Sequence, residues 1–276
     1  MSATQGLNLS AELRDALNDV TKGIERSAAF ALLGESIGAL PPDVTLPPAG
    51  VVFRVGRLAM DKASSHEDAL FAEMRAEFPT YCISYAILAM TSACEEYLQR
   101  VLLIATLAAL ATQQQREMTG EQFQQTRDIC RNEARQTSVD GLVPKILSAV
   151  RAETETVIGL DWFRGVYSMR KCVAHRRGRI GPDDVDENRT LDVAWRKPVL
   201  EVDGRQVVAL PLEVKAGQVV SVGFADEGHS WRLGETISLT AEECQHIGLS
   251  LIIFCTELAN LVQKAMLPLF GVQPPE

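Results

Sequence analysis

A basic cluster lies within the fifteen residues YSMRKCVAHRRGRIG, which run from Tyr167 to Gly181 in an otherwise acidic chain of net charge −9. Arginine carries a permanent, fork-shaped charge that binds phosphate, and histidine exchanges a proton near neutral pH. RNA cleavage without a metal needs both groups, because a ribose 2′-hydroxyl must lose a proton and the resulting phosphorane gathers negative charge. The candidate residues are Arg170 and His175 for catalysis, and Lys171, Arg176, Arg177 and Arg179 for RNA binding.

The cluster lies at the end of an expected helix. Apolar residues recur at spacings of four and three from Trp162 to Val173, and Gly178 is a natural helix stop. Residues five apart on a regular helix project about 140° from one another, so Arg170 and His175 cannot share one face. The two side chains converge only if the helix loosens before Gly178 or if a cleft at a subunit interface receives both, and we expect the second arrangement, in a homodimer. A purely structural role also fits, in which the helix dipole favours the arginines and His175 caps the C-terminus.

Further helices are expected around this one. The first is expected over 9–39 with Ser10 as its N-cap, and a second, more polar helix over 54–77 is closed by Pro79. A long apolar helix should run from Ile83 to Ala108. Two more are expected, one over 121–136 and one that starts at Gly141 with Pro144 in its first turn. Glu95 and Glu96 interrupt the apolar seam of the long helix. Glu96 can pair with Arg100 on the helix surface, and either glutamate could support the candidate site.

Residues 191–239 change to alternating apolar and polar residues separated by turn dipeptides, among them Asp203-Gly204 and Ala216-Gly217. This pattern predicts a small antiparallel sheet of about four or five strands, the last in WRLGETISL. A capping box then begins a final helix at Thr240, which should end before Pro268. The predicted fold is mainly α, a helical bundle with a small antiparallel β-sheet inserted before the last helix. Its parts are an N-terminal helical extension (1–79), the bundle (80–188), the β insertion (189–239) and the last helix (240–270).

Composition bounds the remaining choices. Hydrophobic residues make up 46% of the 276 residues, which is typical of a globular chain. The six cysteines contain no C-x-x-C pair, and no apolar run is long enough to span a bilayer, so a cytoplasmic protein without membrane contact is expected. The acidic balance disfavours indiscriminate coating of nucleic acid. No metal or cofactor motif is present, and His66, His229 and His246 each sit alone.

The residues resemble the HEPN domains, an all-helical family. Its R-x4–6-H signature is similar to Arg170-Lys-Cys-Val-Ala-His175, and the following RRGRIGPDDVDEN looks like the continuation in many members. The segments YAILAMTSACEEYLQRVL and LGETISLTAEECQHIGLSLIIFCTEL resemble the first and last helices of bacterial groups, with the RiboL-PSP type among the most similar. The resemblance covers about 80–188 and 233–265.

The resemblance implies a metal-independent endoribonuclease, a toxin or antiviral effector, acting as a homodimer. Arg170 would bind the scissile phosphate and His175 would act as general base or acid, leaving a 2′,3′-cyclic phosphate and a 5′-hydroxyl. RNA, and an antitoxin or defence-system protein, are the implied partners. Lys171 stands where active members commonly have Asn, Asp or His, and Arg177 where one toxin branch carries a modifiable tyrosine. A catalytically inactive module that binds nucleic acid, a nucleotide or a partner protein is the alternative, and a helical scaffold that binds an uncharged ligand or is purely structural is the third hypothesis.

Overall fold

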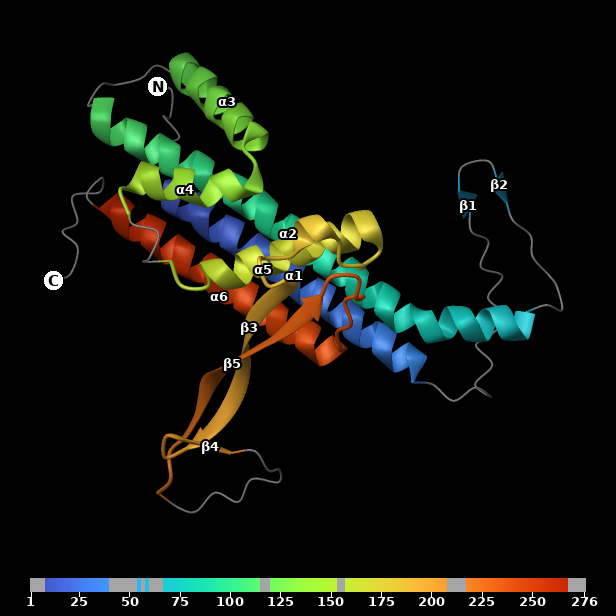
Figure 1. Ribbon diagram of the computed structural model, residues 1–276. Helices are drawn as coiled ribbons and strands as arrows, with labels where there is room; N and C mark the ends of the chain where they lie inside the picture. The colour runs from blue at the N-terminus through green and yellow to red at the C-terminus, as the bar shows by residue number, and fades with distance from the viewer. Residues whose placement is uncertain are drawn as a thin grey trace.

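The computed structural model describes residues 8–39, 54–55, 58–59, 67–114, 120–152, 157–207 and 217–267 (Figure 1). The main helices are α1 (Leu9–Gly38), α2 (Glu67–Gln114), α3 (Gly120–Gln136), α4 (Val139–Val150), α5 (Leu160–Arg176) and α6 (Ala241–Met266). A small antiparallel sheet precedes α6. The predicted mainly helical fold with an antiparallel sheet before the last helix is therefore confirmed.

The core of the bundle forms where α1, α2 and α6 pack along one another (Figure 1). The apolar stripe of α1 is buried as its spacing predicts, with Val20 and Ile24 at 3% and 1% exposure. The helix begins one residue before the predicted cap, because the side chain of Asn8, rather than Ser10, accepts a hydrogen bond from the Ala11 N–H at 3.0 Å. The N-terminal helix thus shares one hydrophobic core with the rest of the bundle.

Two predictions in the N-terminal third are wrong. The predicted helix over 54–77 is present from Glu67 onward, as the start of α2, but its first part is not helical: β1 (Arg54–Val55) pairs there with β2 (Leu58–Ala59). Pro79 does not end a helix but lies inside α2, where its ring packs against Gly38 of α1. A side chain at position 38 would collide with that ring, so glycine permits the contact. Packing against α1 thus outweighs the local cost of proline, and the predicted boundary at 79/80 falls within a continuous helix.

The start of α4 also differs from the prediction. The helix begins at Val139, two residues before Gly141, with Ser138 at its N-cap position. Pro144 consequently lies inside the helix rather than in its first turn. The segment is buried along one side, where Leu142 and Ile146 are both fully covered, which explains why it stays helical.

The sheet is built on β3 (Thr190–Val202), which pairs with β4 (Arg205–Val207) on one side and β5 (Val220–Arg232) on the other. Asp203 and Gly204 form the tight turn between β3 and β4, with φ values of 53° and 74°, as predicted. The described residues form three strands here rather than four or five. Trp231 lies inside β5, which ends at Arg232, instead of starting a new strand, and of the Ala216-Gly217 turn only Gly217 is described.

Helix α6 closes the fold and carries the predicted capping box, in which the Thr240 hydroxyl accepts from the Glu243 N–H at 3.1 Å. It ends at Met266, and Pro268 lies outside the described residues. By length and composition alone α6 could cross a membrane, but 56% of its most apolar window is buried inside the protein. Burial of this kind is typical of a core helix.

Candidate functional site on helix α5

Helix α5 positions most of the predicted site residues. Val166 and Met169 are buried as predicted, but at the two ends of the stripe the buried residues are Phe163 and Cys172 instead of Trp162 and Val173. Leu160 extends this buried face to the start of the helix. The helix ends with Arg177 in the left-handed conformation at φ 54°, and the Gly178 N–H then donates to the Cys172 carbonyl at 3.1 Å. Gly178 has a φ of 82°, which explains why the helix stops there as predicted.

Arg170 is held at the edge of the bundle by two neighbours. Its guanidinium lies 3.9 Å from the Glu95 carboxylate of α2 and 5.3 Å from the centroid of the Tyr167 ring. About a quarter of its side chain is exposed, while its Nε is buried without a hydrogen-bond partner among the described residues. A buried guanidinium N–H without an acceptor is costly, and a phosphate from outside would reach it only if the side chain shifted. The exposed quarter of the side chain is the part of the guanidinium that such a ligand can contact directly.

Of the two candidate glutamates, the structure brings only Glu95 to Arg170. Glu96 instead lines a shallow pocket of about 190 Å³ between α1 and α2. Arg100 lines the same pocket and donates to Asp19 of α1 at 2.7 Å, which replaces the pair expected between Glu96 and Arg100. Position 95 therefore belongs to the candidate site and position 96 to the packing of α1 on α2.

Lys171 approaches the same aromatic ring as Arg170. Its Nζ lies 5.2 Å from the Tyr167 centroid and 3.8 Å from the Asp140 carboxylate of α4. The pKa of Tyr167 is raised, first by burial and then by the nearby Glu95 carboxylate, while the Arg170 guanidinium lowers it. The neutral phenol thus provides one platform against which two cations lie.

His175 lies in the last turn of α5 and is exposed. It makes no hydrogen bond or ion pair with another described residue. Because α5 is helical through Arg176, His175 projects about 140° away from Arg170. The spacing in the sequence predicted that these two side chains cannot share one face of the helix, and within one chain they indeed lie apart.

The trailing arginines differ in their surroundings. The Arg176 guanidinium pairs with Asp184 and, at 3.2 Å, with Asp183, which fixes the 3₁₀ turn of Pro182–Asp184 to the end of α5. Burial acts to raise the pKa of Asp184, but the Gly181 N–H and the Arg176 guanidinium outweigh it and lower that pKa. The charge and the N–H donors of Arg176 are therefore already used by these two aspartates, which leaves fewer of them for binding RNA phosphates.

Arg177 and Arg179 are exposed, and neither forms an ion pair with a described residue. Arg179 is fixed through its backbone, which forms an isolated bridge with Thr236 ahead of α6. The two side chains remain available to an anionic ligand near the C-terminal end of α5.

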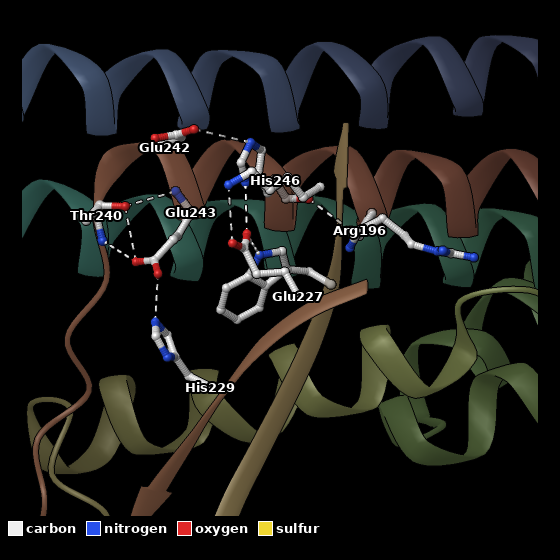
Figure 2. Close-up of polar contacts among 10 residues, drawn as sticks. Arg196, Glu227, His229, Thr240, Glu242, Glu243 and His246 are labelled. Atoms are coloured by element: carbon white, nitrogen blue, oxygen red, sulfur yellow. Dashed lines mark hydrogen bonds and ion pairs between the residues drawn. The ribbon is translucent and has the colours of Figure 1, made fainter. Parts of the chain in front are cut away.

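The prediction that His229 and His246 sit alone is wrong (Figure 2). His229 Nε2 lies 2.7 Å from the Glu243 carboxylate, and His246 Nδ1 lies 3.2 Å from that of Glu227. Each pair joins β5 to α6, with the histidine on the strand in one pair and on the helix in the other. His66 lies outside the described residues.

Glu227 is the centre of this second cluster. Its carboxylate also accepts from the Trp195 indole N–H at 2.9 Å and from Lys197 at 3.5 Å. Burial acts to raise the pKa of Glu227, but the hydrogen bonds from Trp195 and His246 outweigh it and lower that pKa. No sequence signal joins residues 227 and 246, because their contact depends on how β5 lies across α6. We interpret the cluster as the attachment of the sheet to the bundle.

Among the described residues, no group of three or more His, Cys, Asp or Glu side chains could hold a metal ion. The chain matches no known protein-family model, no curated protein and no solved structure. The site is thus defined by its own geometry: two cations against Tyr167, a carboxylate beside each of them, and an exposed histidine further along the same helix.

Proposed function

We propose that the protein is a metal-independent endoribonuclease of the HEPN type that acts as a homodimer. The observation that carries the proposal is the setting of Arg170, whose guanidinium is held by Glu95 and Tyr167 but keeps a buried Nε–H without an acceptor. A phosphate that contacts the exposed part of the guanidinium would take advantage of its permanent charge, and a small shift of the side chain would let a phosphate oxygen accept from the Nε–H as well. The exposed His175 on the same helix supplies the group that can exchange a proton.

In the proposed reaction, the neutral imidazole of His175 accepts the proton of a ribose 2′-hydroxyl, and the oxygen attacks the adjacent phosphorus. The phosphorane charge is stabilised by Arg170. The bond to the 5′-oxygen then breaks, and that oxygen takes a proton from an imidazolium or from water. The products are a 2′,3′-cyclic phosphate and a 5′-hydroxyl, and no oxidant or cofactor takes part.

The site would be completed by a second copy. Arg170 and His175 point about 140° apart on one helix, so a two-fold axis beside α5 would pair His175 of one copy with Arg170 of the other. Lys171 and Arg179 would then line the RNA path on both sides of the axis. The six cysteines are free and buried, which suits the cytoplasmic location that we propose together with a toxin or defence role.

A second candidate is a catalytically inactive module that binds nucleic acid, a nucleotide or a partner protein. The observation in its favour is that much of the positive charge is already compensated within the chain. Arg176 is paired with Asp183 and Asp184, and Arg170 has Glu95 as a neighbour. Such a site would hold an anion without moving a proton.

The test is RNA cleavage in EDTA by the wild type, Arg170→Ala, His175→Ala and the control Arg135→Ala, which removes an exposed arginine from α3. We expect the first two variants to lose cleavage at least about a hundredfold, as general acid–base and charge-stabilising groups do. The control should cleave like the wild type, and the products should end in cyclic phosphate. A wild type that cleaves no RNA, or active Arg170→Ala and His175→Ala variants, would refute the nuclease.

Mixing the two inactive variants tests the shared site. Random exchange makes half of the dimers mixed, and each mixed dimer regains one of two sites, so about a quarter of wild-type activity should return. A site contained in one chain would regain none. Binding of RNA that depends on Arg170 and Lys171 without cleavage would favour the second candidate.

A further inference from the structure

The exposed side of α5 carries a row of polar side chains. Arg164, Ser168, Lys171 and His175 follow one another at spacings of four, three and four residues, so they project within about 60° of one another around the helix. The two cations and the histidine are exposed, and Ser168 is partly buried. We call these four residues the α5 row. It runs for about 16 Å along the helix axis, from Arg164 near the start of the helix to His175 in its last turn.

The α5 row gives His175 cationic neighbours within its own chain. Arg170 projects about 140° away from His175, but Lys171 lies about one helical turn from it on the same side. Arg164 lies about two turns beyond Lys171, outside the basic cluster that begins at Tyr167. A phosphate backbone that reaches His175 and continues along this side of α5 therefore meets Lys171 first and Arg164 next.

Both cations of the row have carboxylate neighbours that a phosphate can replace. The Arg164 guanidinium lies 3.5 Å from the Asp161 carboxylate, and Lys171 Nζ lies 3.8 Å from that of Asp140. Both distances are longer than the roughly 2.7–3.2 Å of a good N–H···O hydrogen bond. The side chains of Asp161 and Asp140 are 93% and 72% exposed, so water screens both pairs and each contributes little to stability. The cations can thus turn to a phosphate at small cost.

Ser168 adds a hydroxyl between the two cations. In other helices of this protein, the hydroxyls of Thr106 and Thr256 each donate to the carbonyl four residues earlier at 2.8 Å. The Ser168 hydroxyl makes no hydrogen bond with any residue that the structure describes. It is therefore free to donate to an oxygen of a phosphate that Lys171 or Arg164 binds.

We propose that the α5 row binds one strand of single-stranded RNA, and that Arg164 binds a phosphate of that strand about two or three nucleotides from the scissile bond. The inference rests on the proposed function, which places the scissile bond at His175. A single row of contacts follows one backbone, whereas proteins that bind duplex RNA contact both strands across a groove. The RNA must then extend past the cleavage point by at least about two nucleotides on the Arg164 side.

The test is the binding of a labelled ten-nucleotide single-stranded RNA, measured by fluorescence anisotropy in EDTA. All proteins carry His175→Ala, so that the RNA stays intact. Adding Arg164→Ala should weaken binding about three- to tenfold and reduce the slope of log affinity against log salt by about 0.7, as the loss of one phosphate contact does. Asp161→Ala should instead tighten binding, because it removes the carboxylate that competes with the phosphate.

The matched controls are Arg131→Ala and Asp128→Ala on α3. Asp128 and Arg131 form the same kind of exposed pair, three residues apart and at 3.9 Å, on a different helix. Both controls should bind RNA as the parent protein does. Circular dichroism checks that every variant folds.

RNA length tests the placement of Arg164. Affinity should rise from two to ten nucleotides, and Arg164→Ala should remove the gain beyond about four nucleotides without changing the binding of shorter RNA. The inference is overturned if the parent binds no RNA, if Arg164→Ala and Arg131→Ala have equal effects, or if Asp161→Ala weakens binding. The proposed function fails separately, when wild-type protein binds RNA through the α5 row but does not cleave it.

Discussion

Trp195 attaches the sheet to the helical bundle, and its replacement by phenylalanine should measure that attachment. The side chain is fully buried, and its indole N–H donates to the Glu227 carboxylate at 2.9 Å. The adjoining Arg196 N–H donates to the Ser250 hydroxyl of α6 at 2.7 Å, so β3 meets the bundle at this point. Trp195→Phe keeps an aromatic ring but removes the donor and part of the packed volume.

Two effects contribute to the expected cost. The smaller ring leaves a cavity of about 40 Å³, which at the usual cost per volume destabilises the fold by about 1 kcal/mol. A hydrogen bond to a charged acceptor contributes about 1.5–3 kcal/mol when it is buried. The side chain of Glu227 is 32% exposed and keeps His246 and Lys197, so screening reduces that contribution to about 0.5–1 kcal/mol. The sum is about 1.5–2 kcal/mol.

Urea unfolding followed by far-ultraviolet circular dichroism gives the free energy of unfolding for Trp195→Phe, Glu227→Gln and the double variant. The hydrogen bond should appear as a coupling of about 0.5–1 kcal/mol between the two positions. A cost below about 0.5 kcal/mol for Trp195→Phe would refute its role as the anchor. A full cost with no coupling would assign the effect to packing and remove Glu227 from the explanation.

Three further outcomes are expected. Gly34→Ala should lower the free energy of unfolding by about 1–2 kcal/mol, because its new methyl group would collide with α2 and only part of that cost is offset by helix propensity; a melting temperature equal to the wild type would contradict it. Tyr97→Phe should cost about 1 kcal/mol in urea unfolding, since it removes the hydrogen bond to the Cys255 carbonyl at 2.7 Å; no change would show that this bond adds no stability. Burial acts to raise the pKa of Glu227 and Glu243, but the hydrogen bonds that these carboxylates accept outweigh it and lower both pKa values. The ionised carboxylates therefore stabilise the fold above the ordinary carboxyl pKa, and this stabilisation is lost as the pH falls through the lowered values. Glu227→Gln should flatten the acid side of a plot of melting temperature against pH, and an unchanged slope would contradict this.

The regular helices could be predicted because their signals are local. The apolar spacing of α5 and α6 and the capping box at Thr240 each specify an element without knowledge of its neighbours. The Asp203-Gly204 turn is likewise a local signal, because its left-handed backbone suits these two residue types. Local signals of this kind place Arg170 and His175 on one helix and set the angle between them.

The failures come from contacts between distant segments. Pro79 reads as a stop in sequence, but Gly38 of α1 gives its ring a place to pack and the helix continues. The pairing of His246 with Glu227 arises only when β5 crosses α6. Neither the spacing of the histidines nor their neighbours in the chain could indicate these partners.

The arginines of the basic cluster, similar in sequence, have different physical roles in the structure. Arg176 contacts Asp184, whose side chain is only 5% exposed, and so holds the turn after α5 in place. Arg170 has a nearby carboxylate at the longer distance of 3.9 Å and an Nε–H without an acceptor, so it retains the capacity to bind an anion. If replacing Arg176 abolishes activity, the cause would be a disturbed turn at the end of α5. If replacing Arg170 abolishes activity while the fold stays intact, the cause would be the loss of a group that binds the phosphate. The functional hypothesis thus depends on Arg170, and the charge of the cluster as a whole is a poor guide to it.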